Sequence, residues 1–403
     1  MKRRDFLTAS AVFSLLASVP AFAAKKTHAK TTQKKTHAST KTKSKKSAHV
    51  LAVEPEAVEE TRSALSLPDE PLAQWRSYDI STTLTLKKAG GKARIWLPLA
   101  QYKDTPWQRT LGHHWQGNFS NAGIYRDPVA EMEVFYADWK EGVGVPQLNI
   151  VSQVGTQDRH FDITRRTATV ERTEVLRRCL QSSSQVPTDG LIRRTAERII
   201  GRIKDPVALG KAIYDWVVEN TDYDPAQPGF GGGNVNAMLD GGRMGGKSAD
   251  IALLFVGLCR AMGLPARPVF GMRIDYSRLF SGLGVSGAGA DLSQAQHCRA
   301  EFYAPGYGWI PVDPSDVRKA SLDEHLGNAD PKRVVLKKLL FGFWEMNWIG
   351  FNAAQDVELH GASGKALPAL LLPHVETATG RFDSLDRERL SYKVSARRVE
   401  GSS

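Results

Sequence analysis

Residues 241–267 read GGRMGGKSADIALLFVGLCRAMGLPAR, a glycine-rich loop followed by an apolar run. The apolar residues that recur in this run are Ile251, Leu254, Phe255, Leu258 and Met262. Their spacing of three and four residues predicts a buried helix that begins near Ser248. Gly263 and Pro265 predict where this helix ends. The stretch therefore places Ser248 at the start of a helix that a domain is built around.

Ser248 allows three interpretations. Residues 241–248 fit the phosphate-loop pattern of Gly, any four residues, and Gly-Lys-Ser. The preceding GNVNAMLD does not resemble the buried strand that a phosphate loop leaves, so nucleotide binding is kept as the last alternative. A serine at this position can also cap the helix by accepting a hydrogen bond from an unpaired amide. The third interpretation is that Ser248 stands where a nucleophile would be.

The third interpretation rests on a segment further along the chain. Residues 296–316 read QHCRAEFYAPGYGWIPVDPSD, which places His297 in one predicted strand and Asp313 at the end of the next. A helix start, a histidine and an aspartate in this order suit a nucleophile, a general base and an acid that orients the base. The candidate catalytic residues are therefore Ser248, His297 and Asp313.

Three sequence blocks, 245–267, 296–319 and 341–359, resemble in this order the core of the bacterial transglutaminase-like family. With KAIYDWVVENTDYD upstream, the resemblance covers about residues 185–360. It implies a papain-like α+β fold whose buried helix starts with a catalytic cysteine, and it implies no metal or other cofactor. Ser248 occupies that cysteine position, whereas His297 and Asp313 match the other two members.

The serine changes the expected function. A thiol at a helix start beside an imidazole ionises readily, but a hydroxyl must lose its proton during the attack. Cys259 lies too far along the helix to substitute, and Cys298 should point to the opposite face of its strand from His297. We therefore expect an inactive or very weak site whose cleft binds peptides or proteins. The alternative is an active amide hydrolase or acyltransferase that uses Ser248.

The chain upstream of this domain predicts a second, β-rich domain. Short apolar segments such as YDISTTLTL, ARIWLPL, EMEVFYADW and QLNIVSQV alternate with turn residues between positions 75 and 165. The fold class is thus α+β, with an antiparallel β-rich domain at 75–165 and a transglutaminase-like domain at 185–360. Residues 361–403 form a C-terminal extension that is expected to end in a strand.

The N-terminal residues predict export. Residues 1–23 combine a basic start, an apolar run and a small-residue cleavage site, and the paired arginines resemble a twin-arginine signal. A disordered Lys-rich tail is expected at 24–49 and a linker at 50–74. We expect a periplasmic or extracellular protein that lacks a transmembrane span and binds peptides, including those of the cell envelope.

The charge distribution narrows the expected partners. The net charge is +11, of which the signal contributes +2 and the Lys-rich tail +9, leaving the rest near zero. The basic tail suits contact with anionic envelope surfaces or a spacer role, and nucleic acid is not an expected partner. The three cysteines are an odd number and define no disulfide framework.

Overall fold

The computed structural model describes residues 74–399, apart from 88–90, 168–169, 243 and 288. The expected export signal (1–23) and Lys-rich tail (24–49) lie outside the described residues, and so does the linker at 50–74 except for Gln74. Among the described helices, none has the length and apolar character needed to cross a membrane.

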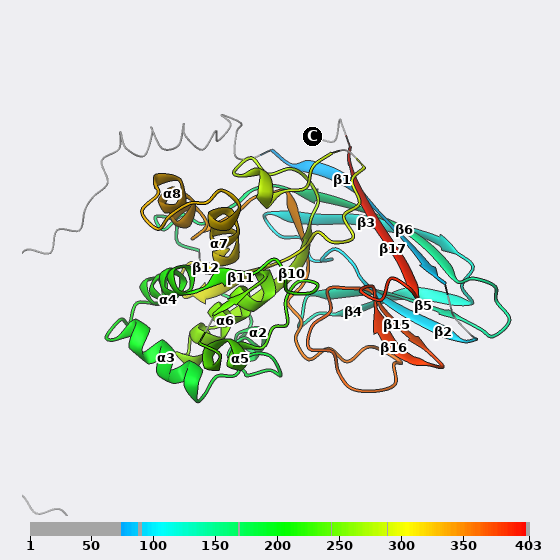
Figure 1. Cartoon of the computed structure of the whole chain (residues 1–403), viewed down its shortest axis with the longest axis horizontal. Coiled ribbons are helices and arrows are strands. Elements are labelled where there is room, and N and C mark those ends of the chain that lie inside the picture. Colours follow the sequence, from blue (N-terminus) through cyan, green and yellow to red (C-terminus); the bar gives the residue numbers. More distant parts are fainter. Residues whose placement is uncertain (1–73, 88–90, 168–169, 243, 288, 400–403) are drawn as a thin grey trace, which may run out of the picture. The chain divides into compact units, whose positions relative to one another are not determined.

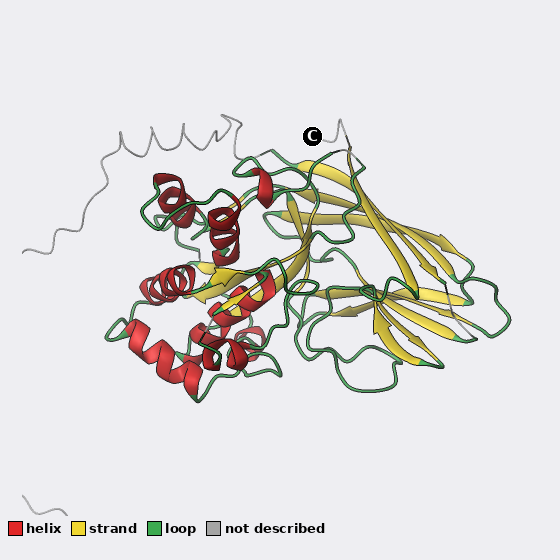
Figure 2. Cartoon of the chain, in the orientation of Figure 1, coloured by secondary structure: helices red, strands yellow, loops and turns green. Residues whose placement is uncertain are grey.

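A four-stranded antiparallel sheet forms the centre of the α+β core. Its strand order is β12 (Gly308–Val312), β11 (Gln296–Ala304), β10 (Ala266–Arg273) and β14 (Trp348–Asn352). Helix α6 (Ser248–Ala261) packs on β10 and β11, and α3 (Leu191–Ile200) and α4 (Pro206–Asn220) pack against α6. Figure 2 shows the helices gathered around this sheet. The core sheet and α6 position the candidate site.

Shorter elements complete the core and connect it to the β-rich part. They are α2 (Thr173–Arg178), β8 (Asp222–Tyr223), α5 (Val235–Asp240), β9 (Gly245–Gly246), η1 (Ser281–Leu283), α7 (Pro314–Asp323), α8 (Pro331–Leu339) and β13 (Phe343–Trp344). Strand β13 pairs with β7 (Arg159–His160), so a strand that follows the β-rich part also belongs to the core.

The helix predictions agree with the structure because each depends on local signals. All residues of α6 are buried, and the helix ends before Gly263, which has a φ of 76°. Asp205 caps α4 by accepting a hydrogen bond from the amide of Ala208 at 2.8 Å, and Pro206 is the first helical residue. A capping acid, a proline and an apolar stripe are thus enough to define these helices from sequence.

The β-rich part consists of two antiparallel sheets. One has the order β17 (Leu390–Val399), β1 (Arg76–Leu86), β6 (Gln147–Thr156) and β3 (Gln108–Gly117). The other has the order β16 (Gly380–Asp383), β15 (His374–Thr377), β2 (Ala93–Pro98), β5 (Met132–Trp139) and β4 (Asn121–Asp127). Buried residues of both sheets, such as Leu84 and Phe135, share one apolar cluster. The C-terminal segment completes both sheets, and β17 lies beside β1 in Figure 1.

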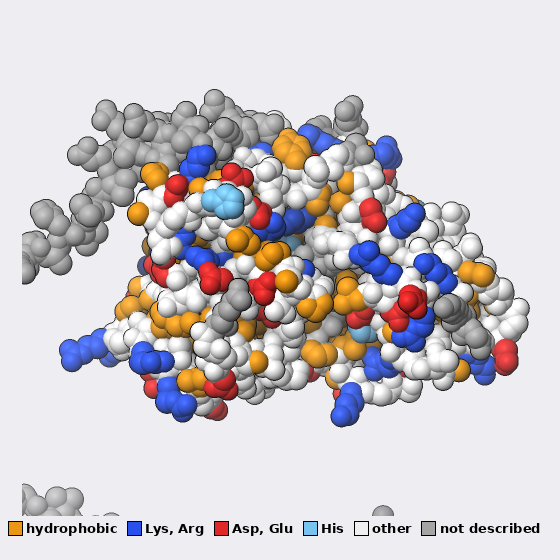
Figure 3. Space-filling model, in the orientation of Figure 1, with side chains coloured by type: hydrophobic (Ala, Val, Ile, Leu, Met, Phe, Trp, Pro, Cys, Tyr) orange, Lys and Arg blue, Asp and Glu red, His pale blue; other side chains and the backbone are white. Residues whose placement is uncertain are grey.

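The predicted α+β fold class is confirmed, with a core sheet packed by helices and separate antiparallel β-rich sheets. Strands β3 and β4 were not expected from the sequence because they carry few apolar residues and are largely exposed. Trp344 and Trp348 are each 1% exposed and pack with Trp107. On the face shown in Figure 3, acidic and basic side chains are interspersed.

Candidate functional site

Ser248 is the first residue of α6, but it does not cap the helix. The capping residue by position is Lys247, and Asp250 in the first turn accepts hydrogen bonds from the amides of Lys247 (2.9 Å) and Gly233 (2.6 Å). The expectation that the Ser248 hydroxyl accepts from helix amides is therefore wrong. The Asp250 carboxylate, in the first turn, reaches back to the amides of residues before the helix and takes that role.

The Ser248 hydroxyl instead contacts the core sheet. Its Oγ accepts a hydrogen bond from the backbone amide of Cys298 at 3.1 Å. Strand β12 pairs with β11 only from Ala300 to Ala304, so the first residues of β11 have no strand neighbour on that edge. The helix start lies at this open edge, so the Ser248 hydroxyl contacts the amide of Cys298, the residue that follows His297. The fold thus brings the two predicted residues into the same region.

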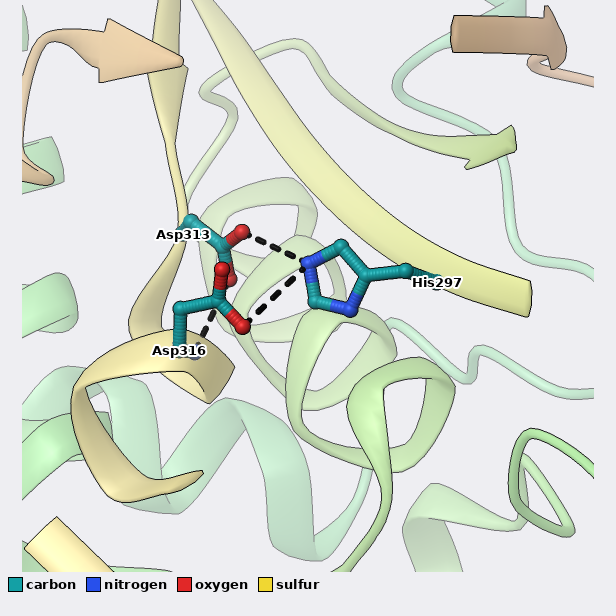
Figure 4. Close-up of side chains that lie close together, drawn as sticks. All are labelled: His297, Asp313 and Asp316. Atoms are coloured by element: carbon teal, nitrogen blue, oxygen red, sulfur yellow. Dashed lines mark hydrogen bonds and ion pairs between the residues drawn. The ribbon is translucent and has the colours of Figure 1, made fainter. Parts of the chain in front are cut away.

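His297 and Asp313 form a direct pair. The Nε2 atom of His297 lies 2.7 Å from Oδ2 of Asp313 and 3.5 Å from Oδ1 of Asp316. Figure 4 shows both carboxylates directed at the same ring nitrogen. Asp313 caps α7, and its Oδ1 accepts from the amide of Asp316 at 3.0 Å and from the hydroxyl of Ser315 at 2.8 Å. These bonds fix the Asp313 carboxylate beside the imidazole.

Arg273, at the end of β10, engages the other ring nitrogen of His297. Its Nη2 donates to Nδ1 of His297 at 3.1 Å and to Oδ1 of Asp316 at 2.5 Å. A guanidinium has no acceptor, so Nδ1 must be the unprotonated nitrogen and the ring proton lies on Nε2, facing Asp313. No hydrogen bond links Ser248 to His297, although the structure describes both residues. The nitrogen that would receive a proton from Ser248 is already in use.

The surrounding charges favour this neutral imidazole. Burial, with the neighbouring charge of Arg273, lowers the pKa of His297, although Asp316 and Asp313 act in the opposite direction. Burial alone would raise the pKa of the Asp313 carboxyl. The hydrogen bond from His297 and the nearby guanidiniums, including Arg299 at 3.2 Å, outweigh burial and hold that pKa well below its usual value. The pair is thus a neutral histidine beside an ionised aspartate.

His297, Asp313 and Asp316 are also close enough to bind a metal, since one ligand atom from each lies within 4.8 Å of the others. Arg273 and Arg299 already hydrogen-bond the two carboxylates. A metal cation there would stand beside two guanidiniums and would have to displace their hydrogen bonds. The cluster therefore suits internal charge pairing better than a metal.

None of the three thiols can replace the serine. Cys179, Cys259 and Cys298 are free and buried. Burial raises the pKa of Cys259 and of Cys298 well above the ordinary thiol value, and both are 0% exposed. His297 and Arg299 both contact Asp313 from one side of β11. Because strand side chains alternate, Cys298 between them points to the opposite side.

The glycine-rich loop does not form a phosphate cradle in its described residues. The amide of Ala249 donates to the carbonyl of Phe230 at 3.2 Å, and the Lys247 ammonium donates to the carbonyl of Gly229 at 3.0 Å. Helix α5 and the two-residue strand β9 precede α6, in place of a long buried strand. The groups that would bind a phosphate are committed within the chain, and nucleotide binding at Ser248 is not supported.

The three predicted residues are enclosed. Ser248 is 2% exposed, His297 3% and Asp313 1%. Three pockets lined by described residues, of about 270, 640 and 690 Å³, include none of them. A substrate can therefore meet the Ser248 hydroxyl only if the residues that bury it move.

Sequence reasoning missed Arg273 and Asp316. Asp316 lies three residues after Asp313, a spacing that places both at the first turn of one helix, so this residue could have been found. Arg273 reaches His297 because β10 pairs with β11 in a register that sets Gly271 opposite His297. No local pattern in the sequence encodes that register.

Residues 193–314 match the transglutaminase-like superfamily. The match includes Ser248, His297 and Asp313, so this part of the chain is similar to transglutaminase-like domains. An uncharacterised protein of Haemophilus influenzae is 29% identical over 339 residues, which cover 80% of this chain and 91% of that protein.

One similar solved structure shows the same kind of fold. A protein from Cytophaga hutchinsonii that has been proposed to be a cysteine protease matches with a TM-score of 0.50 and 15% identity, covering 82% of this chain and 93% of that one. The periplasmic domain of TgpA from Pseudomonas aeruginosa has a TM-score of 0.33 and 16% identity, with 67% of this chain and 93% of that one covered. The first likeness concerns the fold alone.

Proposed function

We propose that the protein is an exported transglutaminase-like protein whose Ser248-His297-Asp313 site is inactive or very weak in acyl transfer. The observation that carries this proposal is the hydrogen bond from Arg273 to Nδ1 of His297. An imidazole nitrogen has one lone pair, so Nδ1 cannot accept from Arg273 and from a serine hydroxyl together. Arg273 therefore occupies the nitrogen that would act as the base.

The alternative, an active hydrolase or acyltransferase, requires two rearrangements. Arg273 would have to leave Nδ1, and Ser248 Oγ would have to turn from the Cys298 amide towards His297. The hydroxyl proton would then pass to Nδ1 while Oγ attacks the amide carbon, and the imidazolium would return that proton to the departing amine. The paired Nε2 and Asp313 are compatible with this step, which is why the alternative is retained.

A binding role needs a surface other than the enclosed site. The pocket of about 640 Å³ is lined by residues of the core and of the β-rich part, among them Trp107, Tyr303 and Trp309. Its wall also includes the carboxylate of Glu171, which accepts a hydrogen bond from the Trp309 indole at 2.9 Å. Aromatic walls with a few polar groups are typical of ligand pockets of this size, and we propose that it receives a peptide segment.

Export and a periplasmic or extracellular location remain part of the proposal. They are supported by the basic start, the apolar run and the small-residue cleavage site of residues 1–23. Amino-terminal sequencing of the protein recovered from a bacterial periplasmic fraction tests them. A chain that keeps Met1 and stays with the cytosolic fraction would refute export.

A fluorophosphonate probe tests the inactive site, because it forms a bond to the Oγ of an activated serine as fluoride leaves. We expect no modification of Ser248 by peptide mass spectrometry, and the same total labelling in the wild type and in Ser248→Ala. Labelling at Ser248 that disappears in His297→Ala would overturn the proposal and support the active alternative.

The binding role has its own test. Calorimetric titration with cell-envelope stem peptides should give micromolar dissociation constants that are unchanged in Ser248→Ala and weakened in Glu171→Gln. Absence of heat with every peptide would refute the binding role and leave the result on catalysis intact.

A further inference from the structure

The buried arginines of the described chain differ in how their charge is balanced. Six arginines are at most 7% exposed. Five of them face a carboxylate: Arg76 with Asp275 at 3.8 Å, Arg267 with Glu301 at 2.6 Å, Arg273 with Asp316 at 2.5 Å, Arg299 with Asp313 at 3.2 Å and Arg333 with Glu219 at 3.0 Å. The sixth, Arg260, makes no such pair within the described residues.

Arg260 lies in the last turn of α6, and its hydrogen bonds within the described residues all go to main-chain carbonyls. Its Nε donates to the carbonyl of Ala266 at 2.8 Å, and its Nη1 donates to the carbonyl of Gln181 at 2.9 Å. Its Nη2 hydrogen-bonds no group of the described residues. Burial lowers the pKa of Arg260 to about 10, which still leaves the side chain charged at neutral pH. A buried positive charge is thus left without a compensating negative one.

Arg260 lines a pocket of about 270 Å³ that also contains Arg178 and Arg267. Arg267 is committed to Glu301, but Arg178 is 42% exposed and, among the described residues, makes a single ion pair, a 4.0 Å contact with Asp127. The pocket wall has one carboxylate, Asp356, which accepts from the amide of Ser184 at 3.0 Å. The pocket therefore contains Nη2 of Arg260, a donor without a described partner, and at its rim the partly exposed guanidinium of Arg178.

We propose that this pocket binds a small oxyanion, either a carboxylate or a phosphate group, between Nη2 of Arg260 and the guanidinium of Arg178. Guanidinium groups bind such anions through charge-assisted hydrogen bonds, often two at a time. The anion would supply the negative charge that the fold provides for each of the other five buried arginines. This inference does not depend on the proposed function of Ser248.

Titration of the full-length protein with inorganic phosphate tests the proposal, with thermal stability and calorimetry as readouts and sodium chloride of equal ionic strength as the reference. We expect phosphate to stabilise the protein more than chloride does. Loss of one charge-assisted contact at the rim should raise the dissociation constant about tenfold in Arg178→Gln. Arg177→Gln, one residue away on the same helix and outside the pocket, is the matched control and should bind like the wild type.

Arg260→Gln should abolish the effect, and Arg178→Gln keeps the test decisive if Arg260→Gln does not fold. Trialanine and trialanine amide separate the possible sources of the anion. If only the free acid and phosphate bind, the pocket recognises the oxyanion; if only the free acid binds, the ligand is a peptide carboxylate. Equal stabilisation by phosphate, trialanine and chloride, or equal binding by Arg178→Gln and Arg177→Gln, would overturn the proposal.

Discussion

The two ends of helix α6 offer a direct comparison of how a buried site handles charge. Beside its first turn, Arg273 and Arg299 hydrogen-bond Asp316 and Asp313, which in turn face His297. At its last turn, Arg260 borders a pocket, and among the described residues it hydrogen-bonds carbonyl groups alone. A catalytic base needs a free lone pair, and an anion site needs a free donor. At the first turn Nδ1 of His297 already accepts from Arg273, whereas at the last turn Nη2 of Arg260 is left without a described partner.

The largest expected effect on stability comes from removing a carboxylate beside the first turn of α6, where the buried arginines are paired. Asp313→Ala removes the helix cap of α7 and leaves Arg299 and His297 without their shared partner. We expect the free energy of unfolding to fall by about 3–5 kcal/mol, as for other broken buried charge pairs. Urea denaturation measures this change. Asp323→Ala, which removes the exposed ion pair with Lys319 on the same helix, should cost less than about 1 kcal/mol. Equal losses would show that the buried cluster is not compensated in this way.

The segment 229–233, whose Gly233 amide hydrogen-bonds Asp250, should tolerate substitution unevenly. A Cβ on Gly231 would lie 2.1 Å from Oδ2 of Asp250, and the residue has a φ of +116°. Gly231→Ala should therefore cost about 2–4 kcal/mol, from backbone strain together with overpacking. Gly232→Ala is the matched control because its Cβ would meet nothing within 4 Å. Similar melting temperatures for the two variants would argue that the loop does not close over Asp250.

Ser248→Ala separates a structural serine from a catalytic one. It leaves the buried amide of Cys298 without a partner, which should lower the free energy of unfolding by about 1–3 kcal/mol. Ser321→Ala removes a hydroxyl bond to the helical carbonyl of Val317 and should change stability less. An unchanged or more stable Ser248→Ala protein would mean that Ser248 is not held by the strand edge.

The smallest expected effect is a pH dependence due to His297. Because its pKa is lowered in the folded state, the unfolded chain binds the proton more tightly as pH falls below about 6.5. His297 should therefore reduce stability by up to about 1.4 kcal/mol for each pH unit below that value, until the folded-state pKa is reached. Urea unfolding between pH 5 and 8 should show a steeper fall in the wild type than in His297→Asn. Parallel curves would contradict a lowered pKa.

The sequence predicted what is local and missed what depends on register. Spacing and caps predicted α4 and α6, and the order of blocks predicted the fold class. His297 lies close to Asp313 because β11, which contains His297, pairs with β12, and Asp313 directly follows β12 as the cap of α7. Arg273 and His297 are 24 residues apart in the chain. They meet through the pairing of β10 with β11, which no short sequence pattern reveals. The interpretation of Ser248 as a helix cap failed because the sequence could not show that the Asp250 carboxylate reaches the amides instead.

The tautomer of His297 decides whether Arg273 occupies the nitrogen that would act as the base. Nitrogen NMR of uniformly labelled protein, with His297 assigned by comparison with His297→Asn, reports which ring nitrogen carries the proton. We expect a neutral ring at pH 7 with its proton on Nε2 and with Nδ1 accepting from Arg273. This state should persist below pH 6.5, the ordinary range for histidine protonation. An imidazolium at pH 7, or a proton on Nδ1, would show that Arg273 does not occupy the base and would contradict the account.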